Sequence, residues 1–198
     1  MPGIEKFALR GGDYGLRQRL DIGLVNNMPD AALRATEMQF ARLLKACATV
    51  LDVRLQLFSL PGIERSNETL ARMEGFYAST DTLAGSSLDA LIVTGSEPRA
   101  EDLRDEPYWP QMAQLVDWAR HSTLSTLWSC LAAHAAVLQL DGIARTPLGE
   151  KCSGVFLCEH AHEDALFARM PGRHYTPHSR RNTLDEKALT AHGYKILS

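Results

Sequence analysis

Short apolar runs that favour β-strands alternate with helical patterns along most of this chain, and this alternation restricts the folds open to it. The β-prone runs occupy residues 20–25, 53–58, 88–95 and 125–129. The helical patterns occupy residues 31–48, 67–73, 108–120 and 131–141. Strands that alternate with helices predict a parallel sheet covered on both faces. The sequence therefore predicts an α/β fold, a flavodoxin-like three-layer sandwich with a mostly parallel sheet.

Cys130 stands where the last β-prone run gives way to an Ala- and Leu-rich helical stretch. A nucleophile at a sharp turn from strand to helix is held clear of the sheet, and the helix N-terminus favours negative charge there. Both effects suit a cysteine, because the thiolate is its reactive form. The alternative is a small buried side chain, since cysteine is among the most buried residue types. Sites in parallel sheets lie beyond the carboxyl ends of strands, where Gly95 also stands, and this agreement favours a functional Cys130.

A thiolate nucleophile needs an oxyanion hole and a base. We expect the backbone N–H of Leu131 to be one donor and the turn formed by Gly95 and Ser96 to supply another, because glycine lets backbones approach closely. An ordinary strand-ending turn is the alternative. For the base, the chain offers seven histidines. His134 comes one turn after Cys130 but shares its helix, so we expect it to line a helix face.

Composition excludes several classes of function. With 198 residues, of which 45% are hydrophobic, the chain can bury a sizeable core. A formal net charge of -3 gives no electrostatic basis for binding nucleic acid or an anionic membrane surface. No apolar run is long enough to span a bilayer, and the N-terminus lacks the apolar core of a signal peptide. We therefore expect a cytoplasmic protein.

The four cysteines form no Cys-x-x-Cys pair and match no common zinc spacing, so no metal site is expected. In a reducing compartment they should be free thiols. The cysteines are Cys47, Cys130, Cys152 and Cys158.

The regular pattern ends near Gly142. We expect residues 1–19 to be a peripheral N-terminal segment and residues 20–198 to form one domain. Beyond Gly142 the sequence predicts a loop entering a strand over 150–157, one or two helical turns over 164–170, a polar loop at 177–180 and a helix over 184–192. Residues 194–198 then begin what the pattern predicts as a further strand, where the chain ends. We therefore expect the domain to lack its C-terminal part.

A set of motifs follows in a specific order between about residues 20 and 181. They are residues 22–30 (IGLVNNMPD), 36–40 (TEMQF), 91–95 (LIVTG), 108–111 (YWPQ), 125–127 (STL) with Cys130, 150–151 (EK) with 153–155 (SGV), and 177–180 (PHSR). In order and spacing the chain resembles the homoserine O-succinyltransferases. That family passes an acyl group from a coenzyme A thioester through a cysteine thioester to the hydroxyl of homoserine, on the way to methionine. Its fold resembles that of class I glutamine amidotransferases.

The resemblance implies roles for single residues. Cys130 would be the acyl-accepting nucleophile, and Lys151 and Ser179 would bind substrate. Without the resemblance, these two would be interpreted as a solvated loop lysine and a turn serine. Arg99 aligns with a position that helps to choose between succinyl and acetyl donors, and a guanidinium group favours a donor with a free carboxylate.

The resemblance also implies the small molecules that the protein uses. Acyl-CoA would be a co-substrate, homoserine or a similar hydroxyl amino acid would be the acceptor, and no cofactor would be bound. The succinyl or acetyl nature of the donor and the oligomeric state stay open, with a homodimer among the options.

The chain departs from the family pattern in two places. The family's basic histidine and supporting glutamate lie in a Gly-His-Pro-Glu-Tyr motif, which these residues do not contain. The loop after Gly95 reads Ser-Glu-Pro-Arg, where the family commonly has Ala-Pro. Three alternatives therefore stay open: an acyltransferase for another hydroxyl amino acid such as serine, a glutaminase-like amidohydrolase, and a non-catalytic binding domain.

Overall fold

The computed structural model describes residues 19–47 and 52–198. Of the expected peripheral segment, residues 1–18 lie outside the described residues. The chain forms two compact units, one that ends at Ala136 and one that spans Val137–Ser198. The expectation of one domain over residues 20–198 stays a prediction.

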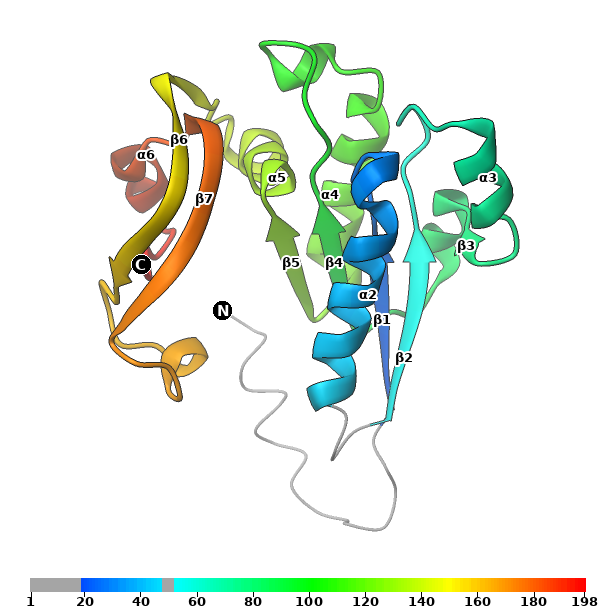
Figure 1. Ribbon diagram of the computed structural model, residues 1–198, viewed down its shortest axis with the longest axis horizontal. Coiled ribbons are helices and arrows are strands. Elements are labelled where there is room, and N and C mark those ends of the chain that lie inside the picture. Colours follow the sequence, from blue (N-terminus) through cyan, green and yellow to red (C-terminus); the bar gives the residue numbers. More distant parts are fainter. Residues whose placement is uncertain (1–18, 48–51) are drawn as a thin grey trace. The chain divides into compact units, whose positions relative to one another are not determined.

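The first unit is built on a parallel sheet with the strand order β3-β2-β1-β4-β5 (Figure 1). The strands are β1 (Arg19–Val25), β2 (Asp52–Phe58), β3 (Tyr77–Ala78), β4 (Ala90–Thr94) and β5 (Ser125–Ser129). Neighbouring strands pair in parallel throughout. When the two-residue β3 is set aside, the long strands follow the flavodoxin-like order. The predicted α/β fold is confirmed.

Helices connect the strands, and α2 and α4 lie on opposite faces of the sheet (Figure 1). The helical segments are α2 (Asp30–Cys47), α3 (Asn67–Met73), the 3-10 helices η1 (Thr80–Gly85) and η2 (Leu103–Asp105), α4 (Trp109–Ser122) and α5 (Leu131–Asp141). Phe40 and Leu44 of α2 pack against Ile22 and Leu24 of β1. On α4, Met112 is 2% exposed. Apolar residues at helical spacing thus cover both faces of the sheet, as the sequence predicts.

The central strands β1 and β4 were recognisable because both of their faces are largely buried. Leu24 and Val25, which point to opposite faces of β1, are both fully buried, and so are Phe58 and Val93. A strand covered on both faces is apolar along its whole length instead of alternating. Each such side chain stabilises the fold by about 1.5–3 kcal/mol relative to an exposed position.

The centre of the sheet is a topological switch point between β1 and β4. From β1 the chain runs outward to β2 and β3, and it then returns to β4 and β5 on the other side. In open α/β sheets, ligands bind beyond the carboxyl ends of the strands at such a point. The fold therefore predicts a ligand-binding site at the residues that follow Val25 and Thr94.

A buried arginine joins the connections at this edge. The Arg65 side chain is 3% exposed. Its Nη1 donates to the Met28 carbonyl and to Asp30 at 3.3 Å. Its Nη2 donates to the Asn26 carbonyl and to the Ser59 hydroxyl, both at 3.2 Å. One guanidinium group thus fixes the ends of β1 and β2 and the start of α2.

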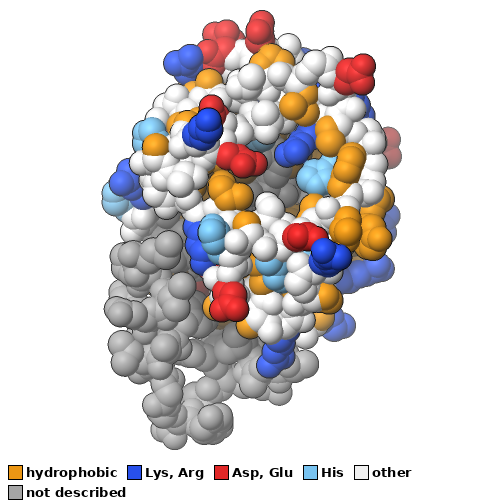
Figure 2. Space-filling model, turned by 90° about the vertical axis from the view of Figure 1, so that its left-hand side faces the viewer, with side chains coloured by type: hydrophobic (Ala, Val, Ile, Leu, Met, Phe, Trp, Pro, Cys, Tyr) orange, Lys and Arg blue, Asp and Glu red, His pale blue; other side chains and the backbone are white. Residues whose placement is uncertain are grey.

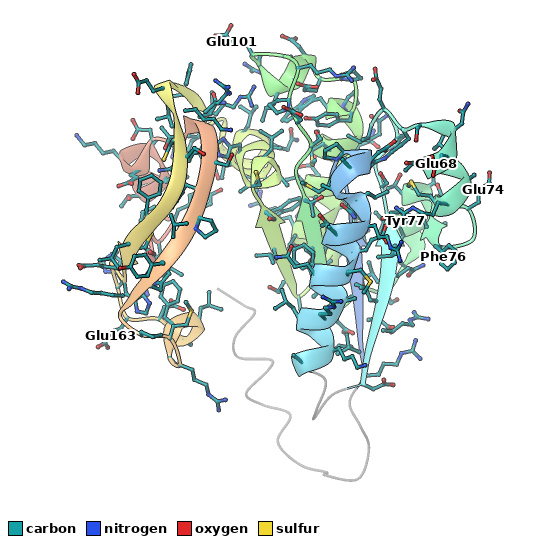
Figure 3. All side chains as sticks on the ribbon, in the orientation of Figure 1. Glu68, Glu74, Phe76, Tyr77, Glu101 and Glu163 are labelled. Carbon is teal, nitrogen blue, oxygen red and sulfur yellow. The ribbon has the colours of Figure 1, made fainter. Side chains whose placement is uncertain are left out.

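Tyr77 anchors the short edge strand β3 (Figure 3). Its hydroxyl donates to Glu37 of α2 at 2.7 Å and accepts from the side-chain amide of Asn26 at 3.4 Å. Burial and the hydrogen bond to Glu37 raise the pKa of Tyr77, which keeps the hydroxyl protonated as a donor. The position of β3 depends on these side-chain contacts, which explains why the apolar pattern did not predict this strand.

The second unit contains an antiparallel ribbon of two strands. Its elements are β6 (Thr146–Glu159), η3 (Ala165–Phe167), β7 (Arg173–Thr183) and α6 (Glu186–Ala191). The His160 ring stacks on Phe167 with a centroid separation of 4.1 Å, and Phe156 meets His178 edge-on at 5.3 Å. On the face turned to the viewer in Figure 2, hydrophobic, acidic, basic and histidine side chains are interspersed.

Two local predictions for this unit are wrong. Residues 177–180, predicted as a polar loop, belong to β7, where Ser179 pairs with Ser153. The polar side chains of this exposed strand give no apolar alternation from which a strand could be recognised. Residues 194–198, predicted as the start of a strand, form none. The Ala161 N–H donates to the Leu197 carbonyl at 2.8 Å and ties this segment to the ribbon's end.

Candidate active site

Cys130 lies at the predicted junction, because β5 ends at Ser129 and α5 begins at Leu131. Its φ is 57°, and among the described residues it is the one non-glycine with positive φ. Residues held in this left-handed region cluster at functional sites, where the surroundings maintain the strain. Cys130 is exposed, which argues against the alternative of a small buried side chain.

Gly95, directly after β4, packs against the first residue of α5. A Cβ atom on Gly95 would lie 2.5 Å from the Cβ and 2.7 Å from the backbone nitrogen of Leu131. The Gly95 N–H donates to the carbonyl of Ser129 at 3.1 Å. The structure thus brings together the turn after β4 and the residues on both sides of Cys130.

These contacts narrow the choice of oxyanion donors. Leu131 is the first residue of α5, so its N–H has no intrahelical carbonyl to bind. The N–H of Gly95 already donates to Ser129. Of the two residues in the turn after β4, Ser96 therefore offers the more suitable backbone donor, while Gly95 permits the close approach.

A cavity of about 380 Å³ lies at the switch point. Its lining includes Asn27, Glu64, Ser96, Arg99, Glu106 and Tyr108. Ser96 therefore belongs both to this cavity and to the turn that contacts α5. The Ser96 hydroxyl oxygen is buried and has no hydrogen-bond partner within the described part of the chain. Buried polar groups are normally hydrogen-bonded, so this hydroxyl is available to a ligand or a water molecule.

Arg99 reaches the rim of this cavity and pairs there with Glu64. Both guanidinium nitrogens of the fork, Nη1 and Nη2, donate to the two carboxylate oxygens at 2.5 Å. The hydrogen bond from Arg99 holds the pKa of Glu64 below its usual value. The side chains are 65% and 74% exposed, so water screens the pair.

The backbone of the Arg99 loop is held by a buried carboxylate. Glu106 is 3% exposed. Its Oε1 accepts the backbone N–H of Arg99 at 2.6 Å and that of Ala100 at 2.7 Å. Burial of a carboxylate is tolerated where hydrogen bonds compensate it. Glu106 therefore fixes the point from which the exposed Arg99 side chain extends over the cavity.

Asn27 is a site residue to which sequence reasoning gave no role. It is fully buried, and its backbone and side-chain amides donate to the Thr94 hydroxyl at 2.8 Å and the Thr94 carbonyl at 3.0 Å. Its side-chain oxygen accepts the Leu60 N–H at 3.0 Å. Asn27 thereby joins the ends of three strands beneath the cavity. The polar Asn-Asn pair directly after a buried strand was the available signal.

Lys151 and Ser179 lie in the second unit, on β6 and β7. Both are exposed. Ser179 pairs with Ser153, two positions beyond Lys151 on the neighbouring strand. The ribbon thus brings these two predicted binding residues near each other. Their convergence with Cys130 on one site stays a prediction.

The structure adds three findings on thiols, metals and membranes. Cys130, Cys152 and Cys158 are free thiols, while the side chain of Cys47 lies outside the described residues. Within residues 19–47 and 52–198, no cluster of three or more His, Cys, Asp or Glu side chains could hold a metal ion. None of the helices described there is long and apolar enough to cross a membrane.

Comparison with known proteins identifies a matching family and similar sequences. The sequence model of the family described as Homoserine O-succinyltransferase matches residues 16–198. A Homoserine O-succinyltransferase from Rhodopseudomonas palustris is 55% identical over 90% of this chain and 54% of its own length. One from Bradyrhizobium japonicum is 51% identical over 95% of this chain and 59% of its own. The chain spans little more than half the length of these relatives.

A solved structure shows a weaker likeness. A putative GMP synthase protein from Thermoplasma acidophilum aligns with 86% of this chain and 69% of its own, at 15% identity and a TM-score of 0.49. The fold assignment rests on the strand order and not on this likeness.

Proposed function

This chain belongs to the homoserine O-succinyltransferase family, and from this we propose that it forms the acyl-accepting part of a homoserine O-acyltransferase in methionine biosynthesis. Cys130 is the proposed nucleophile. The observation that carries the proposal is its exposed position on a left-handed turn between β5 and α5. That position is the one a nucleophile needs at the edge of a parallel sheet.

The proposed reaction has two steps. The Cys130 thiolate attacks the thioester carbonyl of acyl-CoA, the carbon–sulfur bond to CoA breaks, and CoA leaves as a thiol after taking up a proton. The acyl group is then held as a thioester on Cys130. The hydroxyl of homoserine attacks this thioester and gives its proton to a base. The bond from the acyl carbon to the Cys130 sulfur breaks, which releases the Cys130 thiolate and forms an O-acylhomoserine. Acyl-CoA is a co-substrate, and we expect the reaction in the cytoplasm.

Backbone N–H groups of Leu131 and Ser96 are the proposed oxyanion donors in both steps. Each step passes through a tetrahedral intermediate with a negatively charged oxygen, which fixed backbone donors stabilise. The contact between Gly95 and Leu131 supports this assignment because it holds the two donors on adjacent segments. Loss of one such donor typically slows a reaction by about 10²–10³-fold.

Lys151 and Ser179 are the proposed binding residues for homoserine, and Arg99 is the proposed contact for the acyl donor. An ammonium and a hydroxyl group suit a small amino acid with a carboxylate and a hydroxyl. A guanidinium suits the free carboxylate of a succinyl group. The place of Arg99 on the rim of the cavity that includes Ser96 supports the second assignment.

Mass spectrometry after incubation with succinyl-CoA or acetyl-CoA tests the proposal. We expect one acyl group per chain, located on Cys130 by peptide mapping, and none in Cys130→Ser. Cys158→Ser is a matched control that removes another thiol and should leave the labelling unchanged. An adduct on Cys47, Cys152 or Cys158 in place of Cys130 would overturn the assignment.

A further inference from the structure

The rim of the cavity carries an ion pair that joins two loops from different strands. Glu64 comes from the loop after β2, and Arg99 comes from the loop after β4. The two-pronged hydrogen bonding of Arg99 to Glu64 occupies both terminal nitrogens of the guanidinium group. Those nitrogens are the ones with which arginine most readily holds a carboxylate of a ligand.

The structure of this ion pair allows another carboxylate to replace Glu64 as the partner of Arg99. The Arg99 backbone is held by buried Glu106, so the base of the side chain stays in place. Its guanidinium and the Glu64 carboxylate are both largely exposed. Exposed ion pairs contribute little to stability, so an incoming carboxylate can replace one partner at low cost. Depression of the Glu64 pKa by Arg99 keeps Glu64 charged as a competitor.

We propose that Glu64 is a donor-specificity residue, whose carboxylate occupies Arg99 as an internal substitute for a carboxylate at the end of the acyl chain. This inference rests on the proposed function, since it concerns how the same site chooses its acyl donor. A dicarboxylic acyl group, such as succinyl, has to displace Glu64 from Arg99. A neutral acyl group, such as acetyl, has no carboxylate and leaves the ion pair intact. Glu64 therefore weakens the preference that Arg99 alone would give to a carboxylate-bearing donor.

Removal of the competing charge should change the choice between donors in a defined direction. In Glu64→Gln, the rate of Cys130 acylation by succinyl-CoA, divided by the rate with acetyl-CoA, should rise about two- to fivefold, the range that corresponds to exposed ion pairs. The gain should come from tighter binding of succinyl-CoA. Both donors carry the same CoA anion, so general electrostatic effects cancel in the ratio.

Three variants of the 198-residue chain make the test specific. Acylation is followed by intact-protein mass spectrometry over a range of donor concentrations. Arg99→Ala should lower the ratio, and Glu64→Gln should have no further effect in the Arg99→Ala background, because the two residues act as a pair. Glu74→Gln makes the same charge change in an exposed residue that does not line this cavity, and should leave the ratio unchanged.

The outcomes separate this inference from the proposed function. Absence of acylation on Cys130 with both donors would remove the proposed function and this inference with it. Acylation with an unchanged ratio in Glu64→Gln would overturn the role of Glu64 alone. A lower ratio in Glu64→Gln would also overturn it, because it would show that Glu64 supports Arg99 instead of competing for it. Equal effects of Glu64→Gln and Glu74→Gln would also overturn it, because they would show that the ratio responds only to the net charge of the protein.

Discussion

The backbone of Cys130 carries a strain that glycine would not have at the same position. With φ at 57°, an L-residue pays for the approach of its Cβ to the following carbonyl, and glycine does not. We therefore expect Cys130→Gly to be more stable than Cys130→Ala by about 1 kcal/mol. Urea denaturation of the two variants measures this difference, and comparison with alanine removes the contribution of the thiol.

Ser129, the last residue of β5, supplies the matched control for this strain. The same glycine and alanine pair at Ser129 should show the opposite order, since glycine is the less stable residue in an ordinary strand. If glycine were not preferred at residue 130, the left-handed turn would be free of strain. The conformation of the proposed nucleophile would then carry no cost in stability.

Gly95 permits a contact that any side chain would prevent. A Cβ at this position would come within 2.7 Å of the Leu131 backbone nitrogen, and backbone cannot move aside cheaply. Gly95→Ala should cost about 1–3 kcal/mol of stability through overpacking. It should also slow acylation of Cys130, because Leu131 and the turn are displaced together. Thermal unfolding and the labelling rate measure the two effects.

Gly85 provides the control for Gly95. A Cβ on Gly85 meets nothing within 4 Å. Gly85→Ala should therefore change the stability by no more than about 0.5 kcal/mol and leave the labelling rate unchanged. Equal behaviour of the two alanine variants would contradict the close approach of Gly95 to Leu131.

At the scale of elements, the start of α2 is tied to the neighbouring loop through Asp30. Its carboxylate accepts the backbone N–H of Ser66 at 2.9 Å and lies 3.3 Å from the Arg65 guanidinium. These contacts, the Ser66 N–H above all, lower the pKa of Asp30 to about 2 from 3.8. A lowered pKa stabilises the folded protein above the usual pKa of the carboxyl group. That stabilisation is lost as the pH falls from about 4 towards 2.

The stability of the protein should therefore fall more steeply with acid than that of Asp30→Asn. Urea denaturation at a series of pH values between 5 and 2 compares the two slopes. The asparagine oxygen can still accept from Ser66, so the variant keeps this hydrogen bond and loses the titrating charge, which also pairs with Arg65. Parallel slopes would show that Asp30 does not contribute to the acid sensitivity.

The sequence predicted the elements whose signal is local and missed those that depend on distant partners. β1 and β4 are buried on both faces over most of their length and gave apolar runs, while the alternation of residues 53–58 revealed the partly exposed β2. β3 depends on Tyr77 and its contact with Glu37, forty positions away, and no local pattern contains that information. β7 is polar and exposed, so its centre was wrongly predicted as a loop.

The same distinction applies to the candidate site. Cys130 and Gly95 were predictable because each marks the end of a strand that the sequence reveals. The pairing of Arg99 with Glu64 joins residues 35 positions apart. It depends on which loops meet over the switch point, which the strand order determines. Asn27 likewise acts through Thr94, on a neighbouring strand.

Substitutions of the proposed binding residues in the exposed ribbon of β6 and β7 should weaken the binding of homoserine without lowering the stability of the fold. Lys151→Ala should lower affinity for homoserine about tenfold through loss of a charge-assisted hydrogen bond. Its stability should change little, because the side chain is exposed. Titration calorimetry and thermal unfolding give the two quantities. Ser153→Ala, on the same strand, is the control, and an equal loss of affinity there would contradict a specific role for Lys151.

For the whole molecule, a match over little more than half of its relatives' length raises the question of what these residues can do by themselves. The first unit brings together Cys130, Leu131 and the turn at Ser96, which are the groups proposed to carry out acylation. Deacylation also needs a general base. The hydroxyl of homoserine is far less acidic than a thiol, so a base has to take its proton as it attacks the thioester.

The 198-residue chain should therefore accept an acyl group on Cys130 without sustained transfer to homoserine. The family's Gly-His-Pro-Glu-Tyr motif is not among these residues, and a general base contributes about 10²–10⁴-fold in rate. Mass spectrometry should show a stoichiometric adduct that persists when homoserine is added. Release of CoA should stop after one equivalent per chain. Continued release at a rate typical of enzymes would contradict this expectation, and His134, His160 and His162 would then be the bases to test by substitution.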